Sequence, residues 1–378
     1  MQNPDIRFTL GLPATSIVIG AYGAPQALCE PYDDGSTVDT TVATLLGLLG
    51  GIALFLYGMT SMSDSLQNVA GDRMRSILQA VTRNPLLGVL AGAVCTAVLQ
   101  SSSATTVMAI GFVGAGLMGL PQAISIILGA NIGTTITAQI LAFKLSDYIL
   151  AFVFAGFVVM SASKNARTKE IGRAIFGFGL LFLGIDTMGS AMKPLATSPV
   201  FLGMIEQVAN VPVLGVFVGT LMTLVVQSSS ATIAVLQNVA AQPGADGVSS
   251  VLGLGGALPI LFGDNVGTTV TALIASVALS RNAKRVAVSH CLFNISGCVL
   301  FLALLGPFTV LVQALSPTGA EIEIIARQIA NAHTLFNCLM TLLWLPFIGL
   351  LAKLACLVVP DERRDDPRSP VPWGTADA

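Results

Sequence analysis

Residues 100–105 read Gln-Ser-Ser-Ser-Ala-Thr, and residues 227–232 read the same six letters. Each copy lies inside a long apolar stretch with no charged residue near it. A carboxamide and three hydroxyls are costly to bury in an apolar medium unless they are hydrogen-bonded. The same costly cluster at two matching places indicates a binding site built from two halves, which favours a transporter over other classes of protein.

The composition is that of an integral membrane protein. Hydrophobic residues make up 54% of the 378-residue chain and charged residues only 10%, whereas soluble domains carry about 25% charged residues. Apolar runs long enough to cross a bilayer recur along the chain. The net charge of -2 does not indicate a nucleic-acid partner. No CxxC pair occurs among the six cysteines, so we interpret them as packing residues and expect no cofactor.

The repeat extends beyond the serine motif. Residues 84–110 match residues 211–237 at 13 of 27 positions without a gap, at an offset of 127. A second block, GANIGTTIT at 129–137, matches GDNVGTTVT at 263–271 at an offset of 134. A period this long suits the two halves of a transporter.

Hydropathy and the Lys and Arg residues predict the topology. The segments 86–117 and 213–240 are too polar at their centres to be simple spans, so we interpret each as a re-entrant hairpin with the serine motif at its tip. Placing the basic loops in the cytoplasm puts the C-terminus inside and inverts the second repeat relative to the first. The full spans are predicted near residues 42–60, 121–143, 147–163, 171–192, 250–278, 286–305 and 329–352.

The predicted fold is an all-α polytopic membrane protein with two inverted-topology repeats, each containing a re-entrant helical hairpin and a broken transmembrane helix. The predicted parts are an N-terminal extension (1–40), a first repeat (41–163), a second repeat (164–305), a C-terminal transmembrane helix region (306–360) and a disordered tail (361–378).

The hairpin tips have the chemistry of an anion site. A helix that begins near Ser103 or Ser230 directs unpaired N–H groups and a partial positive charge at the tip. Hydroxyl donors beside such a terminus bind anions. The predicted substrate-binding residues are Gln100, Ser101, Ser102, Ser103, Gln227, Ser228, Ser229 and Ser230.

The GxNxGTT blocks suit a cation. Their glycines are expected to break the span, and their neutral oxygens suit a hard cation such as Na⁺. Neither hairpin contains a basic residue, and moving net negative charge through a low dielectric is expensive, so the sequence favours anion–cation symport. The candidate sodium-binding residues are Gln100, Thr105, Asn131, Thr134, Thr135, Gln227, Thr232, Asp264, Asn265, Thr268 and Thr269.

Single polar residues within spans form a second group of candidates. Asp264 replaces Ala130 of the first repeat, and a carboxylate inside a membrane is a functional candidate by default. Asp186 raises the same question. His290 and His333 lie in matching HxLFN segments 43 residues apart, for which we expect hydrogen-bonded structural roles.

Three other interpretations compete with a symporter at the tips. Serine and threonine also allow close helix packing in membranes, although two identical charge-free motifs are more than packing needs. An intramembrane hydrolase would need its nucleophile once, and no GxSxG, HExxH or P-loop occurs, so we expect no enzyme. A transporter of another small anion, such as a dicarboxylate or sulfate, stays open.

From Thr40 to Pro360 the chain resembles the type II sodium–phosphate cotransporters and their bacterial relatives. The resemblance rests on the two QSSS motifs, the GANIGTT and GDNVGTT blocks, and the segments 290–294 and 333–337. It implies Na⁺-driven symport of inorganic phosphate across the plasma membrane, with the serine motifs lining the substrate and sodium sites. The implied partners are phosphate, Na⁺ and the lipid bilayer; homodimer formation and a phosphate-export role stay open.

Many bacterial relatives continue into a cytoplasmic PhoU-like helical domain, which does not follow residue 360 here. We expect either a short natural form or a truncated sequence.

Overall fold

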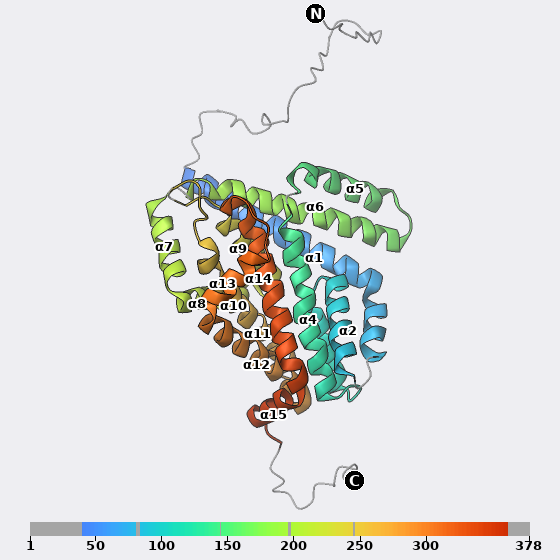
Figure 1. The fold of residues 1–378 in the computed structure, drawn as a ribbon. Helices are drawn as coiled ribbons and strands as arrows, with labels where there is room; N and C mark the ends of the chain where they lie inside the picture. The colour runs from blue at the N-terminus through green and yellow to red at the C-terminus, as the bar shows by residue number, and fades with distance from the viewer. Residues whose placement is uncertain (1–39, 81–83, 144, 196–197, 245, 362–378) are drawn as a thin grey trace, which may run out of the picture. The chain divides into compact units, whose positions relative to one another are not determined.

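The computed structural model describes residues 40–80, 84–143, 145–195, 198–244 and 246–361. The predicted extension (1–40) and tail (361–378) lie outside these ranges, apart from Thr40 and Asp361. Over the described ranges the chain is almost entirely helical, as Figure 1 shows. The helices are α1 (Thr40–Ala80), α2 (Pro85–Leu99), α3 (Ser102–Gly114), α4 (Leu120–Leu141), η2 (Ser146–Tyr148), α5 (Ile149–Ala162), α6 (Ala166–Met192), α7 (Pro199–Asn210), α8 (Pro212–Val226), α9 (Ser229–Ala240), α10 (Gly253–Gly267), α11 (Thr269–Ser276), α12 (Arg281–Ala303), α13 (Leu305–Ala314), α14 (Glu321–Trp344), η4 (Leu345–Phe347) and α15 (Ile348–Val358).

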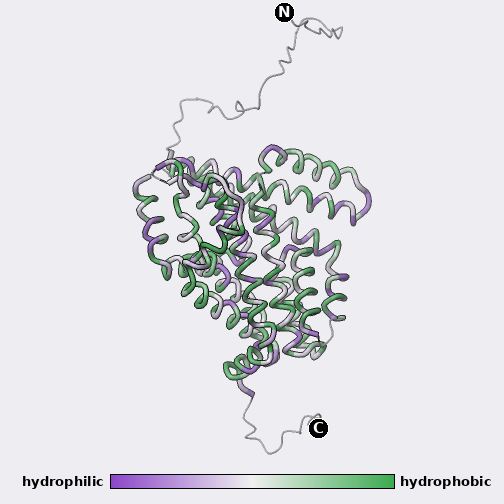
Figure 2. Tube along the Cα trace, in the orientation of Figure 1, coloured by the Kyte–Doolittle hydropathy of each residue, from purple (hydrophilic) through white to green (hydrophobic). Residues whose placement is uncertain are grey.

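Among the described residues, six helical segments are long and apolar enough to cross a membrane. Figure 2 shows that apolar residues dominate the helices and that hydrophilic residues gather at places such as the turn between α5 and α6. The prediction of an all-α polytopic membrane protein is therefore confirmed. The six segments are Val42–Ala80, Leu120–Leu141, Ala166–Met192, Gly253–Ser276, Arg281–Ala303 and Glu321–Val358.

Three helices differ from the predicted spans. The predicted span 147–163 is the 14-residue helix α5, shorter than the ~20 residues that a perpendicular crossing needs. Helix α7 lies outside every predicted span because its polar residues Glu206 and Gln207 lower its hydropathy, and it is bent by 108° relative to α8 where Pro212 begins the new helix. Helix α13 has 10 residues, too few to cross a membrane, and lies almost entirely between the predicted spans 286–305 and 329–352.

The two predicted hairpins are present. Helix α2 ends at Leu99 and α3 begins at Ser102, while α8 ends at Val226 and α9 begins at Ser229. The second arm of each hairpin packs against its first arm and against the long helix of its own half, α4 or α10. The serine motifs therefore lie at helix breaks, as the sequence predicts.

Interlocked glycines join each first arm to that long helix. A methyl group at Gly92 of α2 would overlap the carbonyl oxygen of Ile126, and one at Gly129 of α4 would overlap that of Val89. Small residues spaced four apart allow such close helix approach in membranes.

The second half repeats the contact between α8 and α10. Gly219 lies against the carbonyl oxygen of Ile260, and Gly263 lies against that of Val216. The glycines that match between the two repeats are thus explained by close helix packing in both halves.

Helices α12 and α14 join the two halves, because each packs against both α4 and α10. A cluster of four phenylalanine rings, with centroids 4.5–6.2 Å apart, lies between α10, α12, α13 and α14. The rings belong to Phe262, Phe301, Phe308 and Phe336, all buried. This cluster fills the core on the side of the second repeat.

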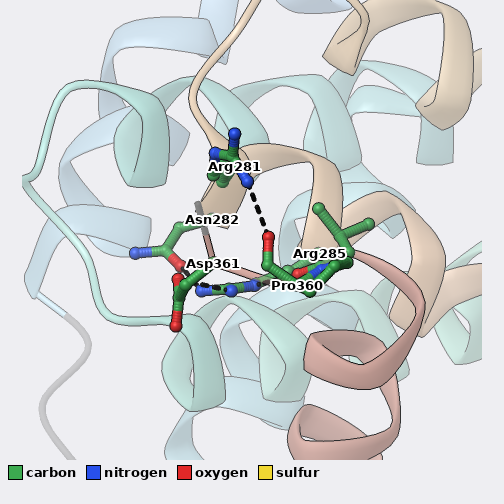
Figure 3. Close-up of polar contacts among 6 residues, drawn as sticks. Arg281, Asn282, Arg285, Pro360 and Asp361 are labelled. Atoms are coloured by element: carbon green, nitrogen blue, oxygen red, sulfur yellow. Dashed lines mark hydrogen bonds and ion pairs between the residues drawn. The ribbon is translucent and has the colours of Figure 1, made fainter. Parts of the chain in front are cut away.

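Arg285 on α12 fixes the chain that follows α15 (Figure 3). Its guanidinium donates to the carbonyl oxygen of Val359 (2.9 Å), to Asn282 Oδ1 (2.8 Å) and to Asp361 Oδ1 (2.7 Å). Arg281 donates to the carbonyl oxygen of Pro360 at 2.7 Å. The end of the last helix is thereby held against the first turn of α12.

The glycine contact predicts a stability difference between two identical substitutions. Gly92→Ala should lower the thermal unfolding temperature of the purified protein, because overpacking a close contact costs about 1–3 kcal/mol. Gly111→Ala on α3 has no atom within 4 Å of the added methyl group, so it should leave that temperature unchanged or raise it through helix propensity. Equal unfolding temperatures for both variants would contradict the packing explanation.

Candidate functional site

Each hairpin turns at a glutamine with an unusual backbone conformation. Gln100 has φ 54° and ψ 30°, and Gln227 has φ 55° and ψ 25°. They are the only non-glycine residues with positive φ among those described. The left-handed conformation costs roughly 1–2 kcal/mol for a residue with a Cβ atom. Such strain tends to persist where function requires it, and here it occurs twice at matching positions.

The serine that follows each glutamine caps the next helix. Ser101 Oγ accepts from the Ala104 N–H at 3.2 Å, and Ser228 Oγ accepts from the Ala231 N–H at 3.3 Å. An N-cap serine satisfies one of the free donors of a helix start and leaves others exposed. The helices thus begin one residue earlier than the sequence predicts, at Ser102 and Ser229.

Several donors at the tips stay free. Among the described residues, no hydrogen bond involves the side chain of Ser102, Ser229 or Ser230, or the N–H groups of the first two residues of α3 and α9. Free N–H groups and hydroxyls at the positive end of a helix can bind an anion.

Matched threonines hold the two arms of each hairpin together below its tip. Thr96 donates to Thr105 at 2.9 Å, and the Thr223 and Thr232 hydroxyls are 3.0 Å apart. All four side chains are buried. These pairs fix the angle at which each tip enters the protein.

Each tip also contacts the other repeat. Ser103 Oγ lies 3.5 Å from Thr271 Oγ1 of α11, and Ser228 Oγ lies 3.6 Å from Met59 Sδ of α1. Within its own half, Gln100 Oε1 accepts from Thr137 at 3.0 Å. No hydrogen bond among the described residues joins the two tips directly. A binding site shared between the two halves therefore stays a prediction.

The two tips differ in exposure. Residues Gln100 to Ser103 are all half-buried, whereas Gln227 is exposed and Ser229 and Ser230 are buried. The free hydroxyls of the first tip are therefore the more accessible ones in this conformation.

Asp264 is fully buried and reaches the second hairpin. Its Oδ1 accepts from Thr223 Oγ1 at 2.6 Å, and its Oδ2 has no partner. The first half has Ala130 at this position beside the corresponding Thr96. A carboxylate with one unpaired buried oxygen needs a proton or a cation to offset its charge.

The predicted sodium ligands Asn131 and Asn265 are engaged by the two histidines. The Asn131 amide donates to the Ile127 carbonyl, so its oxygen faces His290 Nε2 at 3.2 Å and accepts the imidazole proton. Asn265 Oδ1 lies 3.3 Å from His333 Nε2 in the same way. Both histidines are hydrogen-bonded, as the sequence predicts, and each bond joins α12 or α14 to a long helix.

The GxNxGTT blocks break only one of the two long helices. Helix α4 runs without interruption from Leu120 to Leu141, whereas α10 ends at Gly267 and α11 begins at Thr269. The expected break at the first copy is therefore absent, because its glycines serve close packing against α2 instead.

The threonines of these blocks are buried and mostly bonded to their own helices. Thr135, Thr268 and Thr269 donate to carbonyl oxygens three or four residues earlier, at 2.8–2.9 Å. Thr134 is buried as well. Their oxygens keep lone pairs that can accept or coordinate, and nothing in the fold assigns them to an ion.

Comparison with known proteins identifies the family. The Na⁺/Pi-cotransporter family model matches the chain twice, over residues 54–190 and 189–342. The chain belongs to the Na⁺/Pi-cotransporter family. It is thus a multi-pass membrane protein of a transporter family.

Two of the three relatives compared below have names that refer to phosphate. The chain is similar to the uncharacterized protein YqeW of Bacillus subtilis, with 30% identity over 84% of this chain and 98% of the relative. It is 28% identical to the proposed inorganic phosphate export protein YjbB of Escherichia coli over 84% of this chain, and spans only 56% of that relative. Over 27% of the chain it is 36% identical to the human sodium-dependent phosphate transport protein 2B, covering 15% of that protein. No solved structure matches the chain.

Sequence reasoning missed several residues that shape the tips. Thr96, Thr223, Thr137 and Thr271 were each visible as matched positions of the repeat. That match was the only signal, because the contacts span 9 to 168 residues of sequence. The bonds between the histidines and the asparagines were equally hidden.

Asp264 predicts unequal effects of one substitution in the two halves. Thr223→Val should lower the thermal unfolding temperature more than Thr96→Val does, because it also deprives a buried carboxyl of its donor, which costs about 1–3 kcal/mol. The measurement is thermal unfolding of both purified variants in one detergent. A smaller loss for Thr223→Val than for Thr96→Val would contradict this reading of Asp264.

Proposed function

We propose that this protein is a sodium-coupled symporter of inorganic phosphate that works by alternating access. The substrate would bind at the two serine tips, Gln100 to Ser103 and Gln227 to Ser230. Family membership and the names of the relatives support phosphate as the anion. The inverted arrangement of the repeats and the cytoplasmic C-terminus belong to the same proposal.

One observation carries the anion site. Helices α3 and α9, which are 13 and 12 residues long, each present free N–H groups and free serine hydroxyls at their N-termini. The two hairpins themselves contain no charged residue. Phosphate oxygens accept such donors well. Without a lysine or arginine there, the site depends on donors alone and leaves the charge of phosphate uncompensated.

Sodium ions would supply that compensation. Asp264 Oδ2 is the strongest candidate ligand, because it is buried, anionic when deprotonated, and without a partner. Thr105, Thr134, Thr135, Thr232, Thr268 and Thr269 would add neutral oxygens. The oxygens of Asn131 and Asn265 each face one histidine, so one lone pair of each is left for an ion, which makes them weaker candidates than Asp264.

Net export is a second candidate direction, favoured by the name of YjbB. A symporter runs in the direction set by the combined gradients, so the same site serves both directions. We expect no bound cofactor, and assembly as a homodimer is compatible with either direction.

Transport in proteoliposomes tests the proposal. Radiolabelled phosphate uptake should be strong with an inward Na⁺ gradient and weak when K⁺ replaces Na⁺. Labelled sulfate and succinate in parallel assays test the rival anions. Phosphate uptake that ignores Na⁺ would refute sodium coupling, and preferred uptake of another anion would refute the substrate.

The tip serines predict a matched set of variants. Ser102→Ala and Ser229→Ala should each reduce phosphate uptake about tenfold or more, because a hydrogen bond to a charged group contributes about 1.5–3 kcal/mol. Ser289→Ala removes a buried hydroxyl that bonds only its own helix, at the Arg285 carbonyl, and should transport normally. Wild-type uptake in both tip variants would remove the tips from the site.

A further inference from the structure

A cavity of about 180 Å³ lies beside the second hairpin and takes no part in the tip sites. Helices α6, α9 and α14 and the end of α4 line it. Most of its walls are apolar. Its polar side chains are Asp186, Gln237, Asn238 and Glu323.

Two carboxamide side chains of this cavity have oxygens without a partner. The Gln237 amide donates to the carbonyls of Ala138 (3.2 Å) and Ala326 (2.9 Å), and the Asn238 amide donates to the carbonyl of Ile185 (3.0 Å). Both carboxamide oxygens are buried and have no partner. The Gln237 side chain is 96% buried.

The two carboxylates lie at the exposed part of the cavity. Asp186 and Glu323 are exposed, and no ion pair among the described residues involves either of them. The adjacent Arg327 lies over the Phe143 ring, 4.2 Å from its centroid, and donates to the carbonyl and side-chain oxygens of Gln139. The Arg327 guanidinium is therefore bonded to Gln139 near the end of α4.

Such a lining suits a small hard cation, because its carboxylates and carboxamide oxygens are acceptors. Carboxylates at a mouth raise the local cation concentration, and carboxamide oxygens deeper inside can replace water around an ion. Calcium prefers six to eight oxygens with several carboxylates, whereas the buried oxygens here are neutral. The arrangement favours a monovalent ion.

The first half has no equivalent. At the offset of 127, Asp186, Gln237 and Asn238 correspond to Met59, Ile110 and Gly111. The oxygen-lined cavity is thus an addition to the second half, like Asp264.

We propose that this cavity is a sodium-binding vestibule on the route to the second hairpin. Gln237 lies eight residues after Ser229 on the same helix, about 12 Å along its axis. An ion held beside Gln237 would therefore lie about 12 Å along α9 from the second tip. This inference rests on the proposed function, because the ion in the vestibule is the coupling ion. The vestibule would take up Na⁺ before the ion reaches the second hairpin.

The Na⁺ dependence of phosphate uptake by the full chain in proteoliposomes tests this. The double variant Asp186→Asn, Glu323→Gln should raise the Na⁺ concentration for half-maximal uptake roughly tenfold, with maximal uptake at saturating Na⁺ unchanged. Glu321→Gln is the matched control. Glu321 lies two residues before Glu323 on the same helix but accepts from the Ser250 N–H at 3.1 Å, so its loss should change that concentration less than twofold.

Direct binding of ²²Na⁺ to the purified protein without phosphate separates the two proposals. Wild-type binding that the double variant weakens, and that K⁺ does not displace, supports the vestibule even if uptake ignores Na⁺. Unchanged Na⁺ dependence and unchanged ²²Na⁺ binding in the double variant overturn the vestibule and leave symport intact. Displacement of ²²Na⁺ by micromolar Ca²⁺ overturns the choice of a monovalent ion.

Discussion

A helix that stops inside a bilayer leaves backbone N–H and C=O groups that lipid cannot satisfy. Both hairpins of this protein interrupt their helices within apolar stretches, at Gln100 and Gln227, and both use the same residues to do so. The serine after each glutamine caps the new helix, and a threonine pair ties the arms together. What the caps leave unsatisfied are donors at two helix starts, and those donors are the chemistry of the proposed anion site.

The two halves share this plan but differ in charge. The second half alone carries Asp264 behind its threonine pair and the oxygen-lined cavity beside α9. In the proposed function both additions would serve cations, whereas the serine motifs, which would bind the anion, are identical in sequence. The two matching tips would allow one phosphate to be shared between the halves. Because the acidic groups belong to the second half only, sodium would associate with that half.

The sequence predicted the two hairpins well, because an exact repeat of a polar motif in an apolar context leaves few alternatives. It failed where one residue type has two uses. Glycines at 129 and 133 suggested a broken helix, but they allow backbone contact with α2, and α4 stays continuous. The asparagines were predicted as ion ligands, and the sequence did not show that His290 and His333 face their oxygens. Such pairings join residues 159 and 68 positions apart, and no local pattern encodes them.

The interlocked glycines have a mechanical consequence. A contact in which one backbone touches another allows little sliding or rotation, because any shift drives a carbonyl oxygen into a Cα atom. Helices α2 and α4, and likewise α8 and α10, would therefore move as rigid pairs in the proposed transport cycle. Displacement is left to the looser joints between the repeats, such as the 3.5 Å contact of Ser103 with Thr271, which lies at the limit of a hydrogen bond. The helix pairs that carry the proposed substrate site would thus be rigid, and movement would occur at the contacts between the repeats.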